Sequence, residues 1–383
     1  MRKWEEKSFD EIGFIGRGKS RFRPRNAAHL YGGEFPFIQT GDIKAASFRI
    51  TEYSQTYSEA GLAQSKLWKE GTLCITVAAN IADTAILGMD ACFPDSVIGF
   101  VADENKCDVR FVKYFFDVFQ AKMKSISTGA AQDNLSLEKL LTFKMPTPPL
   151  SIQRKIAAIL SAYDGLIENN VKRIKLLEEG AMLRYKGIVK NETLKEVILG
   201  EVCTINKRTL KGDGLNDTIL YVDISSVTQG SINEKTEYEM KDAPGRAKRI
   251  VKHQDIIWSC VRPNRKSFSL VWKPEENLIV STGFAVISSE QISPLFLYQC
   301  LATEEFVKYL ENNATGSAYP AVGAKDFEKA KILIPSKETM MEYQVSMTPI
   351  FNLIHTLQQQ NASLRSGRDL LLPRLMSGAI EVL

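Results

Sequence analysis

The sequence is poor in the residues that build metal and catalytic sites. It contains 3 histidines (His29, His253 and His355) among 383 residues, and its 6 cysteines are far apart with no Cys-x-x-Cys pair. Structural zinc needs ligands at short spacings, and a disulfide framework is typical of short secreted chains. Three scattered histidines also offer no Ser-His-Asp set. The sequence therefore predicts buried free thiols, with no zinc site and no disulfides.

Long apolar runs and a strong net charge are also missing. No hydrophobic stretch approaches the roughly 18 residues of a membrane span, and no apolar segment follows the basic pair at the N-terminus, as a signal peptide requires. We therefore expect no membrane segment and a cytoplasmic location. The net charge of +4 and the 44% hydrophobic content are those of an ordinary globular protein. A chain of this length is expected to form two to three domains.

Basic residues are nevertheless concentrated in two places. The first basic cluster, between Gly16 and Asn26, has five basic residues and no acid: Arg17, Lys19, Arg21, Arg23 and Arg25. The second basic cluster, between residues 246 and 266, has seven against the single acid Asp255: Arg246, Lys248, Arg249, Lys252, Arg262, Arg265 and Lys266. Such clusters in a near-neutral protein favour a polyanion bound at two places. A solvated basic loop is the alternative for either cluster alone.

Several stretches of the sequence recur in the same order in its two halves. Thr128–Ala131 (TGAA) returns as Thr315–Ala318 (TGSA), and Leu166-Ile167 returns at the same offset as Leu353-Ile354. Three β-like pairs accompany them: PFIQTGDI (36–43) with LYVDISSV (220–227), LWKEGTLCI (67–75) with IVKHQDIIW (250–258), and DSVIGFVA (95–102) with VSTGFAVI (280–287). Matches in one order predict two copies of a unit of about 190 residues.

Each copy is expected to consist of a strand-rich globule followed by a long helix. The globules combine short runs of β-branched and aromatic residues with helical stretches at 109–126 and 294–310, which predicts a mixed α/β fold. We expect recognition-type globules at 1–145 and 191–334, and helical spacers at 146–190 and 335–383.

The two spacers carry apolar residues at steps of three and four, typical of helices that pack lengthwise. Proline precedes both, at PTPPLS (146–151) and IPSKE (334–338). Each helix of about 40 residues would reach roughly 60 Å. An isolated exposed amphipathic helix is the alternative for either stripe alone. Pro349 falls within the second stripe, which indicates that this helix begins nearer Thr348.

GFIGRGKS (13–20) fits the P-loop pattern G-x-x-x-x-G-K-[ST]. A genuine P-loop lies between a buried parallel strand and a helix. Here the preceding WEEKSFDEI contains four acids and no apolar run, and the following RFRPRN carries Pro24. We therefore interpret the stretch as a glycine-loosened basic loop rather than a nucleotide site.

Two other catalytic patterns fail in the same way. Asp95 and Glu104 resemble the carboxylate pair that holds Mg²⁺ in many nucleases, but the spacing is short and the repeat has no carboxylate at the position of Asp95. The only double proline, in TPPL (147–150), lacks the acid or amide and the aromatic residue expected for methyl transfer to DNA bases. The sequence predicts a chain without catalytic equipment.

The chain resembles the DNA specificity subunits of Type I restriction–modification enzymes. The resemblance lies in residues 128–179, in their partial repeat from Thr315, and in the ending LLLPRLMSGAI (370–380). Its signature features are the T-G-[SA] turns and the proline-bounded helix entry with its Gln-Arg-Lys-Ile start (153–156). It implies two target recognition domains, each reading half of a bipartite DNA site, separated by two helices in an antiparallel coiled coil.

The same resemblance implies partners. The helices would bind two methyltransferase subunits, and an endonuclease or translocase subunit would complete the restriction form. S-adenosylmethionine, ATP and Mg²⁺ are expected on those partners, with no cofactor or metal on this chain. A specificity chain fused to its catalytic partner is disfavoured, because 383 residues leave no room for a methyltransferase domain.

Thirteen residues are candidate contacts to double-stranded DNA, through phosphates for affinity and through base edges for sequence. In the first globule they are Arg17, Lys19, Arg21, Arg23, Arg25 and Asn80, the last in VAANIAD (77–83). In the second globule they are Arg246, Lys248, Arg249, Arg262, Asn264, Arg265 and Lys266. SCVRPNRKS (259–267) occupies the place of ITVAANIAD (75–83) in its repeat. The alternatives are a P-loop nucleotide-dependent enzyme using Gly13–Ser20 and a coiled-coil adaptor without DNA binding.

Overall fold

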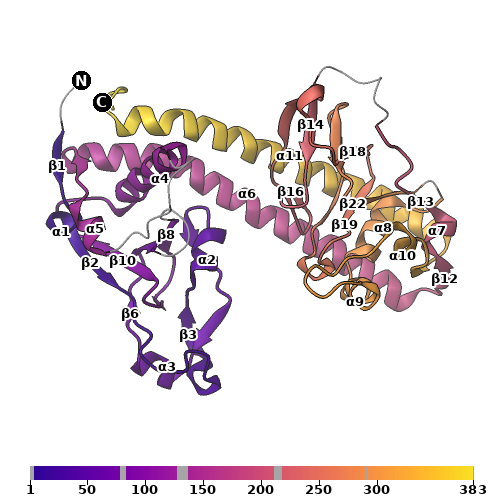
Figure 1. Cartoon of the computed structure of the whole chain (residues 1–383), viewed down its shortest axis with the longest axis horizontal. Helices are drawn as coiled ribbons and strands as arrows, with labels where there is room; N and C mark the ends of the chain where they lie inside the picture. The colour runs from indigo at the N-terminus through magenta and orange to yellow at the C-terminus, as the bar shows by residue number, and fades with distance from the viewer. Residues whose placement is uncertain (1–3, 78–82, 127–136, 211–217, 290, 383) are drawn as a thin grey trace. The chain divides into compact units, whose positions relative to one another are not determined.

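The computed structural model describes residues 4–77, 83–126, 137–210, 218–289 and 291–382 (Figure 1). The chain divides into two compact units. Unit 1 comprises Met1–Val171 and Gln359–Leu383, and unit 2 comprises Lys172–Gln358. Each unit therefore takes part of each long helix together with one strand-rich globule.

Unit 1 contains two main sheets. The order of the first sheet is β2 (Gly13–Arg17), β10 (Val97–Ala102), β7 (Leu73–Thr76), β8 (Thr84–Leu87) and β4 (Arg49–Ile50). The order of the second is β5 (Gln55–Tyr57), β3 (Tyr31–Phe37), β9 (Ala91–Cys92) and β6 (Leu67–Trp68). A ribbon of β1 (Glu5–Lys7) and β11 (Met145–Thr147) joins the globule to its helix. The helices are α1 (Phe9–Ile12), η1 (Ala28–Leu30), α2 (Thr40–Ala45), α3 (Glu59–Ala63), α4 (Val109–Ile126) and α5 (Leu137–Thr142).

Unit 2 repeats this topology. Its first sheet has the order β13 (Cys203–Ile205), β22 (Phe284–Ser289), β19 (Ile256–Ser259) and β20 (Phe268–Leu270), and its second has β17 (Thr236–Glu239), β14 (Thr218–Val222), β21 (Leu278–Ser281) and β18 (Ala247–Ile250). The ribbons are β12 (Lys195–Ile198) with β23 (Lys331–Ile334), and β15 (Val227–Thr228) with β16 (Ser231–Ile232). Its helices are α7 (Leu199–Val202), η2 (Met240–Asp242), η3 (Pro263–Arg265), α8 (Pro294–Leu301), α9 (Glu304–Asn313) and α10 (Ala324–Glu328). The predicted duplication and the mixed α/β fold are confirmed.

Strand register tests the sequence matches individually. β7 (Leu73–Thr76) and β19 (Ile256–Ser259) begin and end at corresponding residues when the match of 67–75 with 250–258 is extended by one residue. Their last residues, Thr76 and Ser259, pair with Val97 and Phe284. The same two pairs show that β10 and β22 correspond two residues away from the alignment of 95–102 with 280–287. Side chains alternate with a period of two along a strand, so such a slip preserves the pattern of faces.

Each unit has its own core, completed by the long helices α6 (Leu150–Asn191) and α11 (Lys337–Met376). In unit 1, Phe9, Phe100 and Phe116 pack with Ile156 and Leu160 of α6 and with Leu372, Leu375 and Met376 of α11. In unit 2, Trp258, Phe268 and Phe296 pack with Ala181 of α6 and Tyr343 of α11. Burial of these aromatic side chains is the main force holding each globule to its helices.

The two helices run antiparallel within each unit. In unit 1, Asn170 Nδ2 donates to Asn361 Oδ1 at 3.0 Å, and Arg368 forms an ion pair with Asp164 at 2.5 Å. Tyr114 of α4 also donates to Asp164, which is almost completely buried. In unit 2, the hydroxyl of Tyr343 donates to the carbonyl of Ala181 at 2.9 Å. The predicted antiparallel pairing is confirmed, and buried polar pairs fix its register in unit 1.

The predicted start of the second helix near Thr348 is wrong, because α11 begins at Lys337 and continues through Pro349. Proline removes one backbone donor and crowds the carbonyl one turn earlier. Pro349 is exposed, so water can reach the freed carbonyl, and Thr348 Oγ1 donates to the carbonyl of Gln344 at 2.7 Å. Helix 337–376 therefore tolerates a proline that the sequence rule treats as a boundary.

The cysteines are free thiols, as predicted: five are buried, and Cys260 is half-buried. Burial raises the pKa of the Cys107 thiol to about 12, so this group is inert at neutral pH. In the part of the chain that the structure describes, no helix is long and apolar enough to span a bilayer.

Candidate nucleic-acid interface

Gly13–Ser20 does not adopt the geometry of a phosphate-binding loop. Residues 13–17 form strand β2, antiparallel to β10, and no helix follows directly. The amides of Gly18 and Lys19 donate to the carbonyls of Val97 and Phe93 at 2.9 and 3.0 Å, so they cannot cradle a phosphate. The predicted loop is thus half strand, and the exposed basic loop begins only after Arg17.

The carboxylates Asp95 and Glu104 lie beyond opposite ends of β10, a strand of six residues. At about 3.3 Å per residue the strand holds them far outside the reach of one metal ion. Arg25 Nη2 also donates to both carboxylate oxygens of Asp95, at 2.8 and 3.0 Å. Within the described ranges, no three His, Cys, Asp or Glu side chains are grouped as metal ligands.

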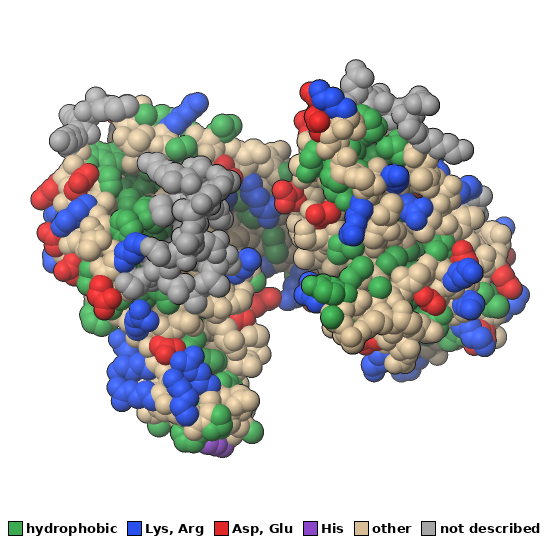
Figure 2. Space-filling view, viewed as in Figure 1, with side chains coloured by type: hydrophobic (Ala, Val, Ile, Leu, Met, Phe, Trp, Pro, Cys, Tyr) green, Lys and Arg blue, Asp and Glu red, His purple; other side chains and the backbone are tan. Residues whose placement is uncertain are grey.

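The first basic cluster lies on the connection from β2 to β3, and all five of its side chains are exposed. Figure 2 shows Lys and Arg gathered on the lobe of unit 1 that carries β3, β6 and α3. Arg25 is neutralised by Asp95, and Arg23 donates to the carbonyls of Ser20 and Phe22 at 2.7 and 2.9 Å. Arg17 Nη1 likewise donates to a carbonyl, that of Asp95, at 3.4 Å. Arg25 is therefore the member of the cluster with an ion-pair partner among the described residues, and the charge of the other four is uncompensated there.

Lys66 joins this charged surface although the sequence analysis did not select it. Its Nζ lies 3.6 Å from the ring centroid of Trp68 and 4.5 Å from that of Phe14, whose side chain is 56% exposed. Burial and the neighbouring Lys19 lower the pKa of Lys66. Lys66 stands directly before the match of 67–75 with 250–258, and Arg249 stands at the same place in the repeat. Extending that match by one residue upstream therefore aligns two basic residues, and this alignment is the sequence pattern that indicates Lys66.

The second basic cluster divides between two places in unit 2. Arg246 and Lys248 are exposed at β18, whereas Arg249 is partly buried and its Nη1 donates to Thr209 Oγ1 at 3.3 Å. Asp255, the single acid in the cluster, is buried and pairs with Arg208 at 2.5 Å, outside the cluster. The charge of Arg246 and Lys248 is therefore not cancelled by Asp255.

The other part of the second cluster forms the turn between β19 and β20, around η3. Asn264 and Arg265 are exposed there, Arg262 is partly buried, and Lys266 pairs with Glu304 of α9 at 2.5 Å. This turn occupies the same place in the topology as the β7–β8 connection of unit 1. Asn80, the predicted base contact in that connection, lies outside the described residues.

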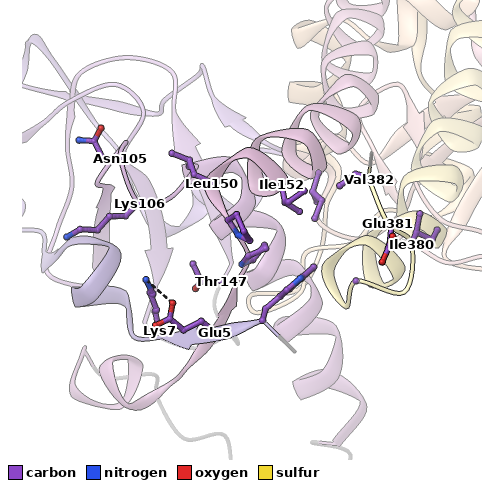
Figure 3. Close-up of a pocket in the computed structure, with 15 residues that line it drawn as sticks. Glu5, Lys7, Asn105, Lys106, Thr147, Leu150, Ile152, Ile380, Glu381 and Val382 are labelled. Carbon is purple, nitrogen blue, oxygen red and sulfur yellow. Dashed lines mark ion pairs between the residues drawn. The ribbon is translucent and has the colours of Figure 1, made fainter. Parts of the chain in front are cut away.

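The cavity shown in Figure 3 belongs to unit 1 and has a volume of about 790 Å³. It is lined by apolar side chains such as Leu150, Ile152 and Ile380, with a Glu5–Lys7 ion pair at its edge. Lys106 also lines it, whereas Asp95 and Glu104 do not. None of the twelve candidate contacts that the structure describes lines this cavity, so the charged surfaces and the cavity are separate features.

The long helices also present apolar side chains to solvent. Six are more than half exposed: Leu166, Leu176 and Leu183 on α6, and Met341, Val345 and Leu370 on α11. Leu166 is exposed although its neighbour Ile167 is buried. Met341 and Val345 line one surface of α11, and adjoining exposed apolar residues are typical of protein–protein contacts.

The duplicated globules, their separate basic surfaces and the antiparallel helices define a class of protein built to bind through two equivalent modules. The family description "Type I restriction modification DNA specificity domain" matches residues 1–179 and 191–365. The chain belongs to this family of Type I restriction–modification specificity subunits.

Individual relatives agree with this assignment. The MjaIX specificity subunit of Methanocaldococcus jannaschii is 22% identical, with 99% of this chain and 94% of the relative aligned. The HindI specificity subunit of Haemophilus influenzae is 30% identical over 40% of this chain and 31% of its own length. The crystal structure of a Type I S subunit from M. genitalium shares the fold, with a TM-score of 0.51, 14% identity and coverage of 99% of this chain and 96% of that one.

Proposed function

We propose that each globule reads one half of a bipartite site in double-stranded DNA. The observation that carries this proposal is the presence, on both copies of one fold, of an exposed basic surface whose charge the protein itself leaves largely unpaired. Lysine and arginine contacts to phosphates supply affinity and position, and side chains at base edges supply sequence. Two readers on one chain also gain from effective concentration when their separation matches the half-sites.

The helices are the proposed docking surface for two methyltransferase subunits, which the exposed apolar residues of α6 and α11 support. S-adenosylmethionine would then be held by those partners, and ATP and Mg²⁺ by a restriction subunit. On this proposal the isolated chain neither methylates nor cleaves DNA. Turnover by rigorously purified protein that Lys19→Ala or Glu104→Ala abolishes would contradict it.

The direct test is base-resolution mapping of methylated sites in cells that carry this chain and its methyltransferase partner. We expect one bipartite motif with two defined half-sites. Removing charge from the first basic cluster should alter only the half-site read by unit 1. A change in the other half-site would contradict the modular proposal.

We further propose that the helices set the spacing of the half-sites, about one DNA turn (near 10 bp) centre to centre. Inserting four residues after Asn169 of α6 and four after Ala362 of α11 adds about 6 Å to each helix and moves the apolar stripes by about one turn. The paired insertion keeps both buried pairs, Asn170 with Asn361 and Asp164 with Arg368. The expected result is a spacer longer by about two base pairs, with both half-sites unchanged. Altered half-sites with an unaltered spacer would show that the helices are not the ruler.

A coiled-coil adaptor without DNA binding is the competing function, favoured by the exposed apolar residues alone. It predicts no salt-dependent binding of the chain to DNA. Fluorescence anisotropy with a labelled duplex at several salt concentrations distinguishes the two.

A further inference from the structure

The turn between β19 and β20 has an unusual backbone for a loop without glycine. Arg262 and Lys266, at either end of η3, both have left-handed conformations, with φ of 52° and 53°. Left-handed backbone is unfavourable for a residue with a Cβ, and such residues cluster at functional sites. Something in the surrounding structure must hold this turn in place.

A second segment, the turn Thr315–Ala321, holds it. The amide of Arg262 donates to the carbonyl of Pro320 at 2.7 Å, and its Nη2 donates to the carbonyl of Ala318 at 3.1 Å. Val322 donates to the carbonyl of Cys260 at 2.9 Å, and Val261 forms a β-bridge with Ala321. The two turns are therefore joined along their backbones from Cys260 to Arg262.

The side chain of Arg262 is bound to protein rather than directed freely outward. Its guanidinium lies 4.4 Å from the ring centroid of Tyr319, whose side chain is 68% exposed. At the other end of η3, Lys266 is held by Glu304. Two of the four predicted contacts in this turn, Arg262 and Lys266, thus have partners within unit 2.

The other two predicted contacts in this turn are Asn264 and Arg265. Both are exposed, and within the described residues neither side chain forms a hydrogen bond or ion pair, while Pro263 beside them is buried. An asparagine amide can pair in a bidentate manner with adenine, and an arginine guanidinium with guanine. A rigid turn is where such side chains would be held at a defined register.

We infer that Asn264 and Arg265 are the base-reading residues of unit 2, and that Arg262, stacked on Tyr319, is a positioning residue rather than a phosphate contact. This inference rests on the proposed function. It assigns a role to Tyr319 and to the turn Thr315–Ala321, which the sequence indicated only as a repeat.

The experiment combines methylation mapping with anisotropy titrations of the complex with its methyltransferase partner. The duplex carries the mapped site, and the salt concentration is varied. Asn264→Ala and Arg265→Ala should each relax one base position in the half-site of unit 2, with discrimination falling roughly 5- to 150-fold. The half-site of unit 1 serves as the internal control and should not change.

Arg262→Ala and Tyr319→Ala should relax the positions of Asn264 and Arg265 together while leaving the salt slope unchanged. Tyr319→Phe keeps the ring and should behave as wild type. The variant Arg262→Lys distinguishes a positioning role from a phosphate contact and controls for misfolding of Arg262→Ala. Lysine keeps the charge but loses the planar stack, so this variant should also relax specificity. A salt slope lower by about one in Arg262→Ala, restored in Arg262→Lys, would identify a phosphate contact and overturn the inference.

The inference and the proposed function fail differently. Absence of a bipartite motif or of salt-dependent binding in the wild-type complex overturns both. A normal wild-type motif that neither Asn264→Ala nor Arg265→Ala alters overturns only the assignment of these residues.

Discussion

Units 1 and 2 share the strand order of the second sheet and of four strands of the first, to which unit 1 adds β4, yet they carry their charge in different places. Unit 1 concentrates it on the β2–β3 connection, whereas unit 2 places it on β18 and on the β19–β20 turn. In unit 2, the β13–β14 connection contains Arg208, which is engaged by the buried Asp255. The difference shows that this topology fixes where loops emerge but leaves free which of them carries the basic residues. Two modules can then bind different sequences without a change of fold.

The units also differ in how their helices are joined. Unit 1 has the buried group of Asp164, Arg368 and Tyr114, whereas in unit 2 the neutral hydroxyl of Tyr343 donates to the carbonyl of Ala181. A buried ion pair is costly to break because the remaining charge stays desolvated. Unit 1 therefore has a stricter requirement on its helix register than unit 2.

Arg368→Ala should have the largest effect on stability. It leaves Asp164 buried without its cation and is expected to lower the free energy of unfolding of unit 1 by about 3–5 kcal/mol. Hydrogen exchange measured by mass spectrometry should show faster exchange in unit 1 with unit 2 little affected. Arg365→Ala, exposed on the same helix, is the control and should be nearly silent. Equal loss of protection in both units would contradict the separation of the two.

Removing Lys19, Arg21 and Arg23 together tests whether the two charged surfaces are equivalent. If all three side chains contact phosphates, the slope of log affinity against log salt should fall by about three. The matched variant removes Arg246, Lys248 and Lys252 from unit 2 and should give a similar change. Binding titrations on the mapped duplex decide the point, and an unchanged slope in one variant would show that only one unit uses its cluster in this way.

Glu178 should make the free energy of unfolding of unit 2 depend on pH. Burial raises the pKa of this carboxyl from 4.5 to about 7 in the folded chain, so the folded state holds more protons than the unfolded state between these values. The free energy of unfolding should therefore fall as pH rises from about 4.5 to about 7. Glu178→Gln should raise it above pH 7, by on the order of 1–3 kcal/mol, and change little near pH 4. Denaturation at pH 4 and 8 measures this, and an equal gain at both would rule out titration.

Lys66→Ala should have the smallest effect, a salt slope lower by about one, with Lys66→Arg close to wild type. Arg249→Ala, at the equivalent position of unit 2, provides the comparison. Titrations of all three variants on one duplex suffice. If Lys66→Ala leaves the slope unchanged, its contact with Trp68 and Phe14 is structural.

Much of this architecture could be predicted from the sequence, because the duplication and the helical stripes are patterns of hydrophobic spacing. The strand register was harder to predict. The two-residue slip between β10 and β22 keeps every side chain on its face, so the alternation of buried and exposed side chains alone does not detect it. Pro349 gave a wrong helix start, because the rule that proline ends a helix does not consider whether water can reach the freed carbonyl. At the exposed Pro349 it can, and α11 continues. The Arg262–Tyr319 stack joins residues 57 positions apart, and no periodicity reports such a contact. Lys66 lies outside both basic clusters, so a search for runs of basic residues does not select it, whereas a comparison of equivalent positions in the repeat does.

The division of the chain has a consequence for its synthesis. Unit 2 is one continuous segment, Lys172–Gln358, whereas unit 1 needs Gln359–Leu383 to place Leu372, Leu375 and Met376 against Phe9 and Phe100. A ribosome delivers the chain from the N-terminus at about 5–20 residues per second. Unit 2 therefore has its whole sequence available first, and the globule that is made first must wait for the last residues to be translated before its core can close.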